Sequence, residues 1–287
     1  MFFKTAILFR REDPTDSLVL RTGLHLPRPD ATLEEILANN QSITTFGTSS
    51  LRRIAQLRTR CPAVTVKDVR GNINTRIRKL DAHDEHGYDC LVMATAGLVR
   101  GGFAHRISHR LNWYHAVSQG ALGVECRTDD AYMVTEVLAP LVDQRALLEC
   151  LAERVLMKCL EGGCSVPIGV RTRWSEDIVS EKTELTLEAI VLSLNGTQRV
   201  EATATQPLDD TQSLPANAQR AMPTEEEGRL DWSLFDFTDV SVRHFDDQLQ
   251  VRLHNAVLLG RRLATMMIDR GVRDILSAIN RAKQQDQ

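Results

Sequence analysis

The residues best suited to do chemistry in this sequence are its arginines. Of the 35 basic residues, 29 are arginine and 6 are lysine. A guanidinium group is a planar fork that binds both oxygens of a carboxylate or phosphate, whereas a lysine ammonium is a hydrated point charge. Residues 52–110 have a local net charge of +7, although the formal charge of the whole chain is −3. A solvated surface is the simplest interpretation of such a run, but the bias toward arginine favours an anion site.

One of the six cysteines stands apart. Cys164 comes after two glycines that end a predicted helix, so its backbone is free to project the thiol into a cleft. From its position alone, a small buried residue remains the more common interpretation. The remaining cysteines fall at apolar positions or helix ends and are predicted to be inert: Cys61, Cys90, Cys126, Cys150 and Cys159.

Other chemistries have weaker support. The sequence has no Cys-x-x-Cys or His-Glu-x-x-His pattern, and His105 and His109, although four residues apart, flank a basic surface, so no metal site is predicted. No glycine-rich motif for a nucleotide cofactor occurs. A Cys–His hydrolase stays open, because His115 lies in a predicted turn, but nothing in the sequence places it near Cys164.

Three repeats of strand, turn and helix position the arginines. Strands are predicted at residues 43–47, 64–69 and 89–94, and each is followed by a polar or glycine-containing turn and a helix. This alternation is typical of a mostly parallel sheet, in which ligands bind beyond the carboxyl ends of the strands. Helix N-termini at these turns add free N–H groups and partial positive charge. The nearby arginines are Arg52, Arg53, Arg70, Arg76 and Arg100. An anion-binding cleft is therefore predicted here.

The rest of the chain predicts a different architecture. A strand at residues 121–126 and a helix at 130–141 precede Asp143, which is expected to cap a long helix. Asn195-Gly196 between two alternating runs is a strong hairpin signal, and helices at 251–269 and 272–282 follow. These elements predict an α+β domain. Residues 201–239, with a local net charge of −7, include an acidic insertion without periodicity.

Length and composition limit the class of protein. A chain of 287 residues with 43% hydrophobic and 25% charged residues is typical of a globular protein of about two domains. It has no apolar run long enough to cross a bilayer and no recognisable signal peptide, and its unpatterned cysteines indicate reduced thiols. We therefore expect a cytoplasmic protein that does not bind membranes.

Five motifs in a fixed order resemble the porphobilinogen deaminase (hydroxymethylbilane synthase) family of haem biosynthesis. They are GTSSLRR at residues 47–53, VRGNINTR at 69–76, ATAGLVR at 94–100, HAVSQGALGVECR at 115–127 and LEGGCSVPIG at 160–169. The resemblance covers nearly the whole chain from Arg11 onward, apart from the acidic insertion. It implies a transferase that joins four porphobilinogen molecules into linear hydroxymethylbilane and releases ammonia at each step.

The resemblance also implies a set of site residues. Cys164 would carry a dipyrromethane cofactor through a thioether, in place of the buried thiol that its position alone suggested. Carboxylate contacts would fall to Arg52, Arg53, Arg70, Arg76 and Arg100, with Ser49, Ser50 and Gly71 as hydroxyl and backbone donors. The family is expected to be monomeric. Only Tyr88 and Phe103 interleave the basic region, which argues against a binder of single-stranded nucleic acid.

The sequence departs from the family at its start. The N-terminal motif with the catalytic aspartate does not occur, so the resemblance implies that most of a first domain is missing. The expected architecture resembles a periplasmic binding protein, with a remnant of domain 1 at 1–12, an α/β domain 2 with a mainly parallel sheet at 13–112, a return segment of domain 1 at 113–142, and an α+β domain at 143–287 that contains the insertion at about 207–240.

Two further expectations follow from this departure. The strand at residues 121–126 would lack partner strands and would leave an open edge and apolar surface exposed. The chain as written would be poorly soluble or partly unfolded, and inactive as a deaminase. A non-catalytic anion-binding module and a degenerate paralogue are the alternative interpretations.

Overall fold

The five-stranded sheet is the element that positions the predicted cleft. The computed structural model describes residues 3–25, 32–39, 42–127, 130, 132–160, 166–177, 182–211 and 247–285. The strand order is β4 (Thr65–Lys67), β3 (Thr45–Gly47), β5 (Cys90–Ala94), β2 (Asp16–Leu20) and β6 (His109–Leu111). Strand β3 runs parallel to β4 and β5, whereas β2 runs antiparallel to both β5 and β6.

The sheet is therefore mixed, and the prediction of a mainly parallel sheet is confirmed only in part, because β2 runs antiparallel to both of its neighbours. The three predicted strands do run parallel. The prediction missed β2 and β6, because neither takes part in the strand–turn–helix alternation on which it rested. Strand β2 enters the sheet directly from the preceding extended segment and runs in the opposite direction.

The reversed direction of β2 decides where its first residue lies. Asp16 is paired with Ala94, the last residue of β5, and with Leu111, the last residue of β6. The amino end of β2 thus lies at the edge where the parallel strands end. The carboxylate of Asp16, the first residue of β2, therefore lies at the same edge of the sheet as the arginine-bearing turns.

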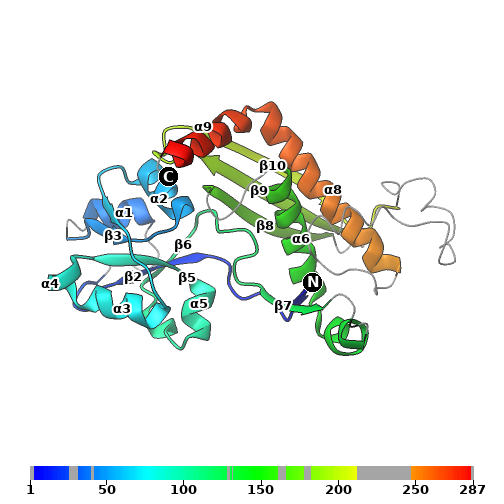
Figure 1. Cartoon of the computed structure of the whole chain (residues 1–287), viewed down its shortest axis with the longest axis horizontal. Helices are drawn as coiled ribbons and strands as arrows, with labels where there is room; N and C mark the ends of the chain where they lie inside the picture. Colours follow the sequence, from blue (N-terminus) through cyan, green and yellow to red (C-terminus); the bar gives the residue numbers. More distant parts are fainter. Residues whose placement is uncertain are drawn as a thin grey trace.

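Helices cover both faces of this sheet (Figure 1). On one face lie α1 (Leu33–Asn39) and α2 (Leu51–Arg60), and on the other lie α3 (Ile73–Asp81), α4 (His83–His86) and α5 (Thr95–Arg100). Strand β2 is buried on both sides: Leu18 packs with the α1–α2 side of the core, and Val19 packs with the α3–α5 side. The sheet is thus the middle layer of three, as expected for an α/β unit.

The C-terminal half forms a second core. Its antiparallel sheet has β9 (Lys182–Leu192) between β8 (Ile168–Asp177) and β10 (Arg199–Pro207). Three helices cover one face of this sheet: α6 (Gln144–Cys159), α8 (Asp247–Asp269) and α9 (Val272–Gln285). Asp143 caps α6 as predicted, because its side chain accepts a hydrogen bond from the Ala146 amide. The predicted hairpin at Asn195-Gly196 and the α+β character of this part are confirmed.

A small two-stranded sheet pairs the start of the chain with the segment that follows the first core. Strand β1 (Phe3–Leu8) pairs antiparallel with β7 (Leu122–Arg127), so the predicted strand at 121–126 does have a partner within this chain. The exposed large hydrophobic side chains of the described residues nevertheless all lie next to this sheet, at Phe9, Leu122, Tyr132 and Leu141. The predicted helix at 130–141 is instead a π-helical turn, η2 (Met133–Leu138), followed by a 3-10 turn, η3 (Ala139–Leu141).

The two cores meet along α2. Ala55 of α2 packs with Tyr114 and with Ile190 and Leu192 of β9. At the end of the same helix, the Thr59 hydroxyl donates to the carbonyl of Gly196 in the hairpin turn at 3.0 Å. Helix α2 is thus shared by the arginine-bearing edge and the C-terminal sheet. Among the described helices, none is both long and apolar enough to span a membrane.

Candidate functional site

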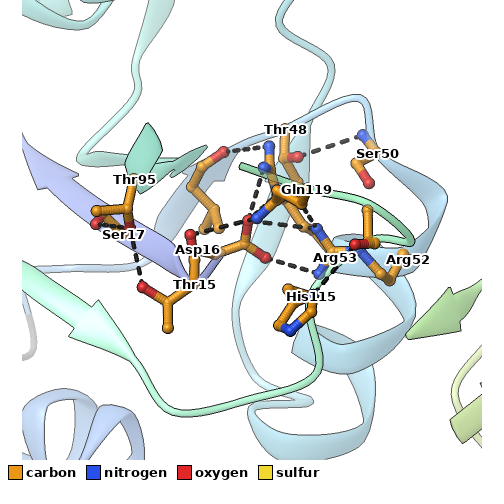
Figure 2. A network of polar contacts seen from close by, with 12 residues as sticks. Thr15, Asp16, Ser17, Thr48, Ser50, Arg52, Arg53, Thr95, His115 and Gln119 are labelled. Carbon is orange, nitrogen blue, oxygen red and sulfur yellow. Dashed lines mark hydrogen bonds and ion pairs between the residues drawn. The ribbon is translucent and has the colours of Figure 1, made fainter. Parts of the chain in front are cut away.

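Asp16 is the centre of a buried polar network at the carboxyl edge of the five-stranded sheet (Figure 2). Arg52 donates to Asp16 from Nη1 at 2.7 Å, and Arg53 donates from Nη2 at 2.7 Å and from Nε at 3.0 Å. The indole N–H of Trp113 and the side-chain amide of Gln119 add donors at 2.9 and 3.0 Å. Both carboxylate oxygens are therefore held by charged and neutral donors.

The two arginines come from the first turn of α2. The relative exposure of Arg52 is 5% and that of Arg53 is 8%, so neither projects freely into solvent. Arg52 also donates from Nη1 to the carbonyl of Tyr114 at 2.7 Å, and Arg53 donates from Nη1 to the carbonyl of Val92 at 3.0 Å. The pair thereby ties α2 to β2, to β5 and to the segment after β6.

The ionisation of the network follows from these contacts. Burial alone raises the pKa of Asp16, but the charges of Arg53 and Arg52 and their hydrogen bonds outweigh it and hold this pKa well below its usual range. Burial lowers the pKa of Arg52, and the neighbouring charge of Arg53 lowers it further, while Asp16 opposes both effects. Asp16 is thus ionised at neutral pH. Two guanidinium groups share one carboxylate, which leaves one uncompensated positive charge.

Two observations indicate that the arginines are not fully satisfied within the protein. The Nε atom of Arg52 is buried and has no hydrogen-bond partner among the described residues. Arg53 has five N–H groups, of which three donate to described residues. Spare donors beside an excess positive charge are what an anionic ligand needs.

A second group of arginines surrounds this network at greater exposure. The side chain of Arg70 is 82% exposed, and its Nε donates to Asp68 at 3.1 Å. Arg76 is half-buried, donates to the carbonyl of Gly71 at 2.6 Å and has a lowered pKa, first because of desolvation and then because of Arg53. Arg100 is exposed and donates to the carbonyl of Gly120 at 2.9 Å. The predicted arginines thus divide into a buried pair and an exposed set.

The small residues of the predicted site have different roles. The Ser49 hydroxyl donates to the Val69 carbonyl at 2.7 Å and accepts from the Val69 amide at 3.2 Å, so it joins the turn after β3 to the turn after β4. The Ser50 side chain stands at the N-cap of α2 without making a cap hydrogen bond. Gly71 has a φ of 115°, a conformation that favours glycine. Ser49 thus already has partners, whereas the Ser50 side chain is not engaged in capping α2.

The predicted cofactor cysteine, Cys164, lies outside the described residues, as does the predicted acidic insertion from residue 212 onward. The surroundings of four other cysteines are described. Burial raises the pKa of Cys61 to about 11 and that of Cys150 to about 12, and it also raises the pKa of Cys90 and Cys159. These thiols are protonated at neutral pH and are therefore weak nucleophiles.

Asp16, Trp113 and Gln119 are site residues that the motifs do not predict. No local signal in the sequence identified Asp16, because arginines at a helix start are expected at the surface unless a partner is known. The position of that partner depended on the direction of β2, which the strand pattern did not reveal. Trp113 and Gln119 lie in a segment of irregular backbone, for which periodicity carries no information.

Metal chemistry finds no support in the described part of the chain, where no group of three or more His, Cys, Asp or Glu side chains is arranged to hold an ion. The polar network can instead bind and orient carboxylates. Its donors are fixed, largely shielded from water and next to one another. Such an arrangement strengthens each charge-assisted hydrogen bond to an anion.

Comparisons with known proteins agree with this chemistry. Residues 2–135 match the family model described as "Porphobilinogen deaminase, dipyromethane cofactor binding domain", and residues 147–223 match "Porphobilinogen deaminase, C-terminal domain". The first match begins at residue 2 and does not show that an N-terminal part is missing.

Curated relatives give the same result. Porphobilinogen deaminase of Eremothecium gossypii is 45% identical over 204 residues, which cover 70% of this chain and 58% of the relative. That of a Synechococcus strain is 44% identical over 207 residues, covering 71% and 60%, and that of Saccharomyces cerevisiae is 42% identical over 202 residues, covering 69% and 58%. The chain spans less than two thirds of the length of these relatives. With two family models matched in order and identities above 40%, the chain belongs to the porphobilinogen deaminase family.

Proposed function

We propose that this chain acts as a hydroxymethylbilane synthase, the transferase that joins four porphobilinogen molecules into a linear tetrapyrrole and releases ammonia. The observation that carries the proposal is the buried network in which Arg52 and Arg53 share the single carboxylate of Asp16. Porphobilinogen carries an acetate and a propionate side chain. A growing pyrrole chain is therefore a polycarboxylate, which suits a site with excess guanidinium charge.

The residues present fit a dipyrromethane cofactor, whose two pyrrole rings also carry acetate and propionate groups. The unpartnered Nε of Arg52 and the spare N–H groups of Arg53 are donors in need of an acceptor. The exposed Arg70 and Arg100 and the half-buried Arg76 would bind further carboxylates around this pair. Ser50 and the backbone at Gly71 would add neutral donors, and Ser49 would hold the two turns together.

The chemistry divides between the cofactor and the chain. When bound through a thioether to Cys164, the cofactor supplies a pyrrole with a free α-carbon for chain growth. The residues of this chain would bind and orient the carboxylate side chains of each new unit, so that the two reacting carbons are brought together. In each condensation a carbon–carbon bond forms, ammonia leaves and the α-carbon gives up a proton. No residue of this chain is assigned to that proton transfer, because the family's aspartate motif does not occur in it.

Intact-mass measurement of the purified protein tests the cofactor assignment. We expect a covalent adduct with the mass of dipyrromethane on the wild-type chain and on Cys159→Ser, and no adduct on Cys164→Ser. Cys159 is a suitable control because it lies shortly before Cys164 and burial raises the pKa of its thiol. An unmodified wild-type thiol, after incubation with porphobilinogen or preformed hydroxymethylbilane, would contradict the proposal.

Consumption of porphobilinogen tests catalysis separately. Measurable turnover by the 287-residue chain would support the synthase function. An adduct without turnover would describe a chain that binds the cofactor and does not catalyse, whereas carboxylate binding without an adduct would favour the alternative, a non-catalytic anion-binding module.

A further inference from the structure

Asp16 is buried too deeply to touch a ligand, yet it determines how the arginines of the site are presented. Its relative exposure is 0%, and its two oxygens together accept hydrogen bonds from Arg52, Arg53, Trp113 and Gln119. Oδ2 accepts from Arg52 and Trp113, and Oδ1 accepts from both arginines and Gln119. Because so many donors bind it, the carboxylate is held in a single orientation. The side chains that donate to it are held in turn.

The contacts fix the plane of each guanidinium group. The Asp16 carboxylate accepts hydrogen bonds from Nε and Nη2, on one edge of the Arg53 guanidinium group. The Val92 carbonyl accepts a hydrogen bond from Nη1 of the same group. Arg52 is held by Asp16 through Nη1 and Nη2 and by the Tyr114 carbonyl through Nη1. An arginine side chain otherwise loses about 2 kcal/mol of rotamer entropy when it is ordered. Here that ordering is complete before any ligand arrives.

We propose that Asp16 is a positioning residue that makes the site select planar carboxylates over spherical anions of equal charge. A fixed fork matches the two oxygens of a carboxylate, whereas a mobile guanidinium attracts any anion as a point charge. Asp16 also offsets one of the two positive charges, so that the site retains one unit of positive charge. The inference rests on the proposed function in one respect: the acetate and propionate groups of porphobilinogen are the carboxylates to be selected.

Alternative explanations predict different behaviour. If Asp16 only stabilised the fold, its loss would lower stability and leave anion selectivity unchanged. If Asp16 only adjusted the net charge, its loss would strengthen the binding of propionate and chloride equally. A loss of selectivity between these two monovalent anions is expected only if Asp16 orients the arginines.

The test compares thermal unfolding in sodium propionate and in sodium chloride at equal ionic strength, with the full 287-residue chain. We expect the wild-type chain to have a higher Tm in propionate than in chloride. Asp13→Asn is the matched control, because Asp13 lies three residues away on the same segment and accepts hydrogen bonds from Arg110 and Thr15, neither of which donates to Asp16. Its propionate–chloride difference should equal that of the wild-type chain. Asp16→Asn should lose this difference, in addition to any fall in Tm in chloride.

A second variant covers the case in which Asp16→Asn does not fold. Trp113→Phe keeps an aromatic ring but removes the indole donor to Asp16 Oδ2, which loosens the carboxylate without removing its charge. We expect it to fold and to show a smaller propionate–chloride difference than the wild-type chain. An unchanged difference in whichever of the two variants folds, or no difference in the wild-type chain, would overturn the inference. The Tm differences do not depend on the adduct at Cys164. The inference about Asp16 and the proposed function are therefore tested by separate measurements.

Discussion

The buried and exposed arginines of this protein do different work with the same side chain. Arg52 and Arg53 lie inside the protein and each make several hydrogen bonds to Asp16 and to backbone carbonyls. Arg70 and Arg100 lie on the surface, each with one polar contact. The buried pair connects elements of the fold, whereas the exposed set is free to follow a ligand. Sequence motifs alone treat both sets as equivalent anion contacts.

The largest difference between the two sets should appear in stability. Arg53→Met removes a side chain with three buried hydrogen bonds, two of them to a carboxylate, and we expect a loss of about 2–4 kcal/mol in the free energy of unfolding. Arg70→Met should change it by less than about 0.5 kcal/mol, because exposed ion pairs contribute little. Urea unfolding followed by circular dichroism measures both. Equal losses in the free energy of unfolding of Arg53→Met and Arg70→Met would contradict the distinction between buried and exposed arginines.

The next effect concerns ligand binding. We expect Arg70→Gln and Arg100→Gln each to weaken the binding of porphobilinogen about tenfold, since a charge-assisted hydrogen bond contributes about 1.5–3 kcal/mol. Neither variant should change stability. Arg78→Gln is the control, because Arg78 is exposed on α3 and was not assigned to the site. Isothermal titration calorimetry measures the affinities, and a weakening by Arg78→Gln of the same size would show that only the overall charge matters.

The pH dependence of stability should also separate buried from exposed carboxylates. The pKa of Asp16 in the folded state lies well below its unfolded value of about 3.9. Its contribution to stability is therefore complete above about pH 4 and is lost as the pH falls from there toward the folded pKa. Asp68, exposed beside Arg70, should contribute little.

This prediction is measured by urea unfolding as a function of pH. The stability of Asp68→Asn should follow the wild-type curve on acidification. Asp16→Asn should start lower at neutral pH and lose less as the pH falls below 4. Parallel curves for Asp16→Asn and the wild-type chain would contradict the assignment of the acid-sensitive group.

The smallest expected effect distinguishes the two serines of the turn after β3. Ser49→Ala removes two hydrogen bonds to Val69 and should lower the free energy of unfolding by about 1 kcal/mol. Ser50→Ala removes no cap hydrogen bond and should change it by less than about 0.5 kcal/mol. If Ser50→Ala proved the more destabilising change, its hydroxyl would have a structural partner rather than a free face.

Much of the arginine-bearing edge could be predicted from the sequence, because local signals specify it. Apolar periodicity and N-cap residues located β3, α2, β4, α3 and β5, and the parallel order of their strands brought the turns together. The predicted hairpin followed from an equally local signal at Asn195-Gly196, and the helices of the C-terminal part followed from their apolar patterns. The prediction missed α1 and the strands β1, β2, β6 and β8; the places of these strands depend on long-range pairing rather than on a local pattern.

The burial of Arg52 and Arg53 could not be predicted for the same reason. A charged side chain is expected at the surface unless a partner is known, and their partner is 36 or 37 residues away in the sequence. The motifs singled out Arg52 and Arg53 but carried no information on their environment. The environment of these arginines depends on the antiparallel direction of β2, which places Asp16 beside α2.

The contact between Trp113 and Asp16 gives the network its own optical reporter. The indole is buried, and its N–H donates to the carboxylate that holds both arginines. The emission wavelength of an indole responds to the electric field of nearby charges. Any anion that adds a negative charge beside Arg52 and Arg53 therefore changes the field at this ring. Tryptophan fluorescence of the unlabelled protein, with Trp113→Phe as the blank, would follow occupation of the site in real time.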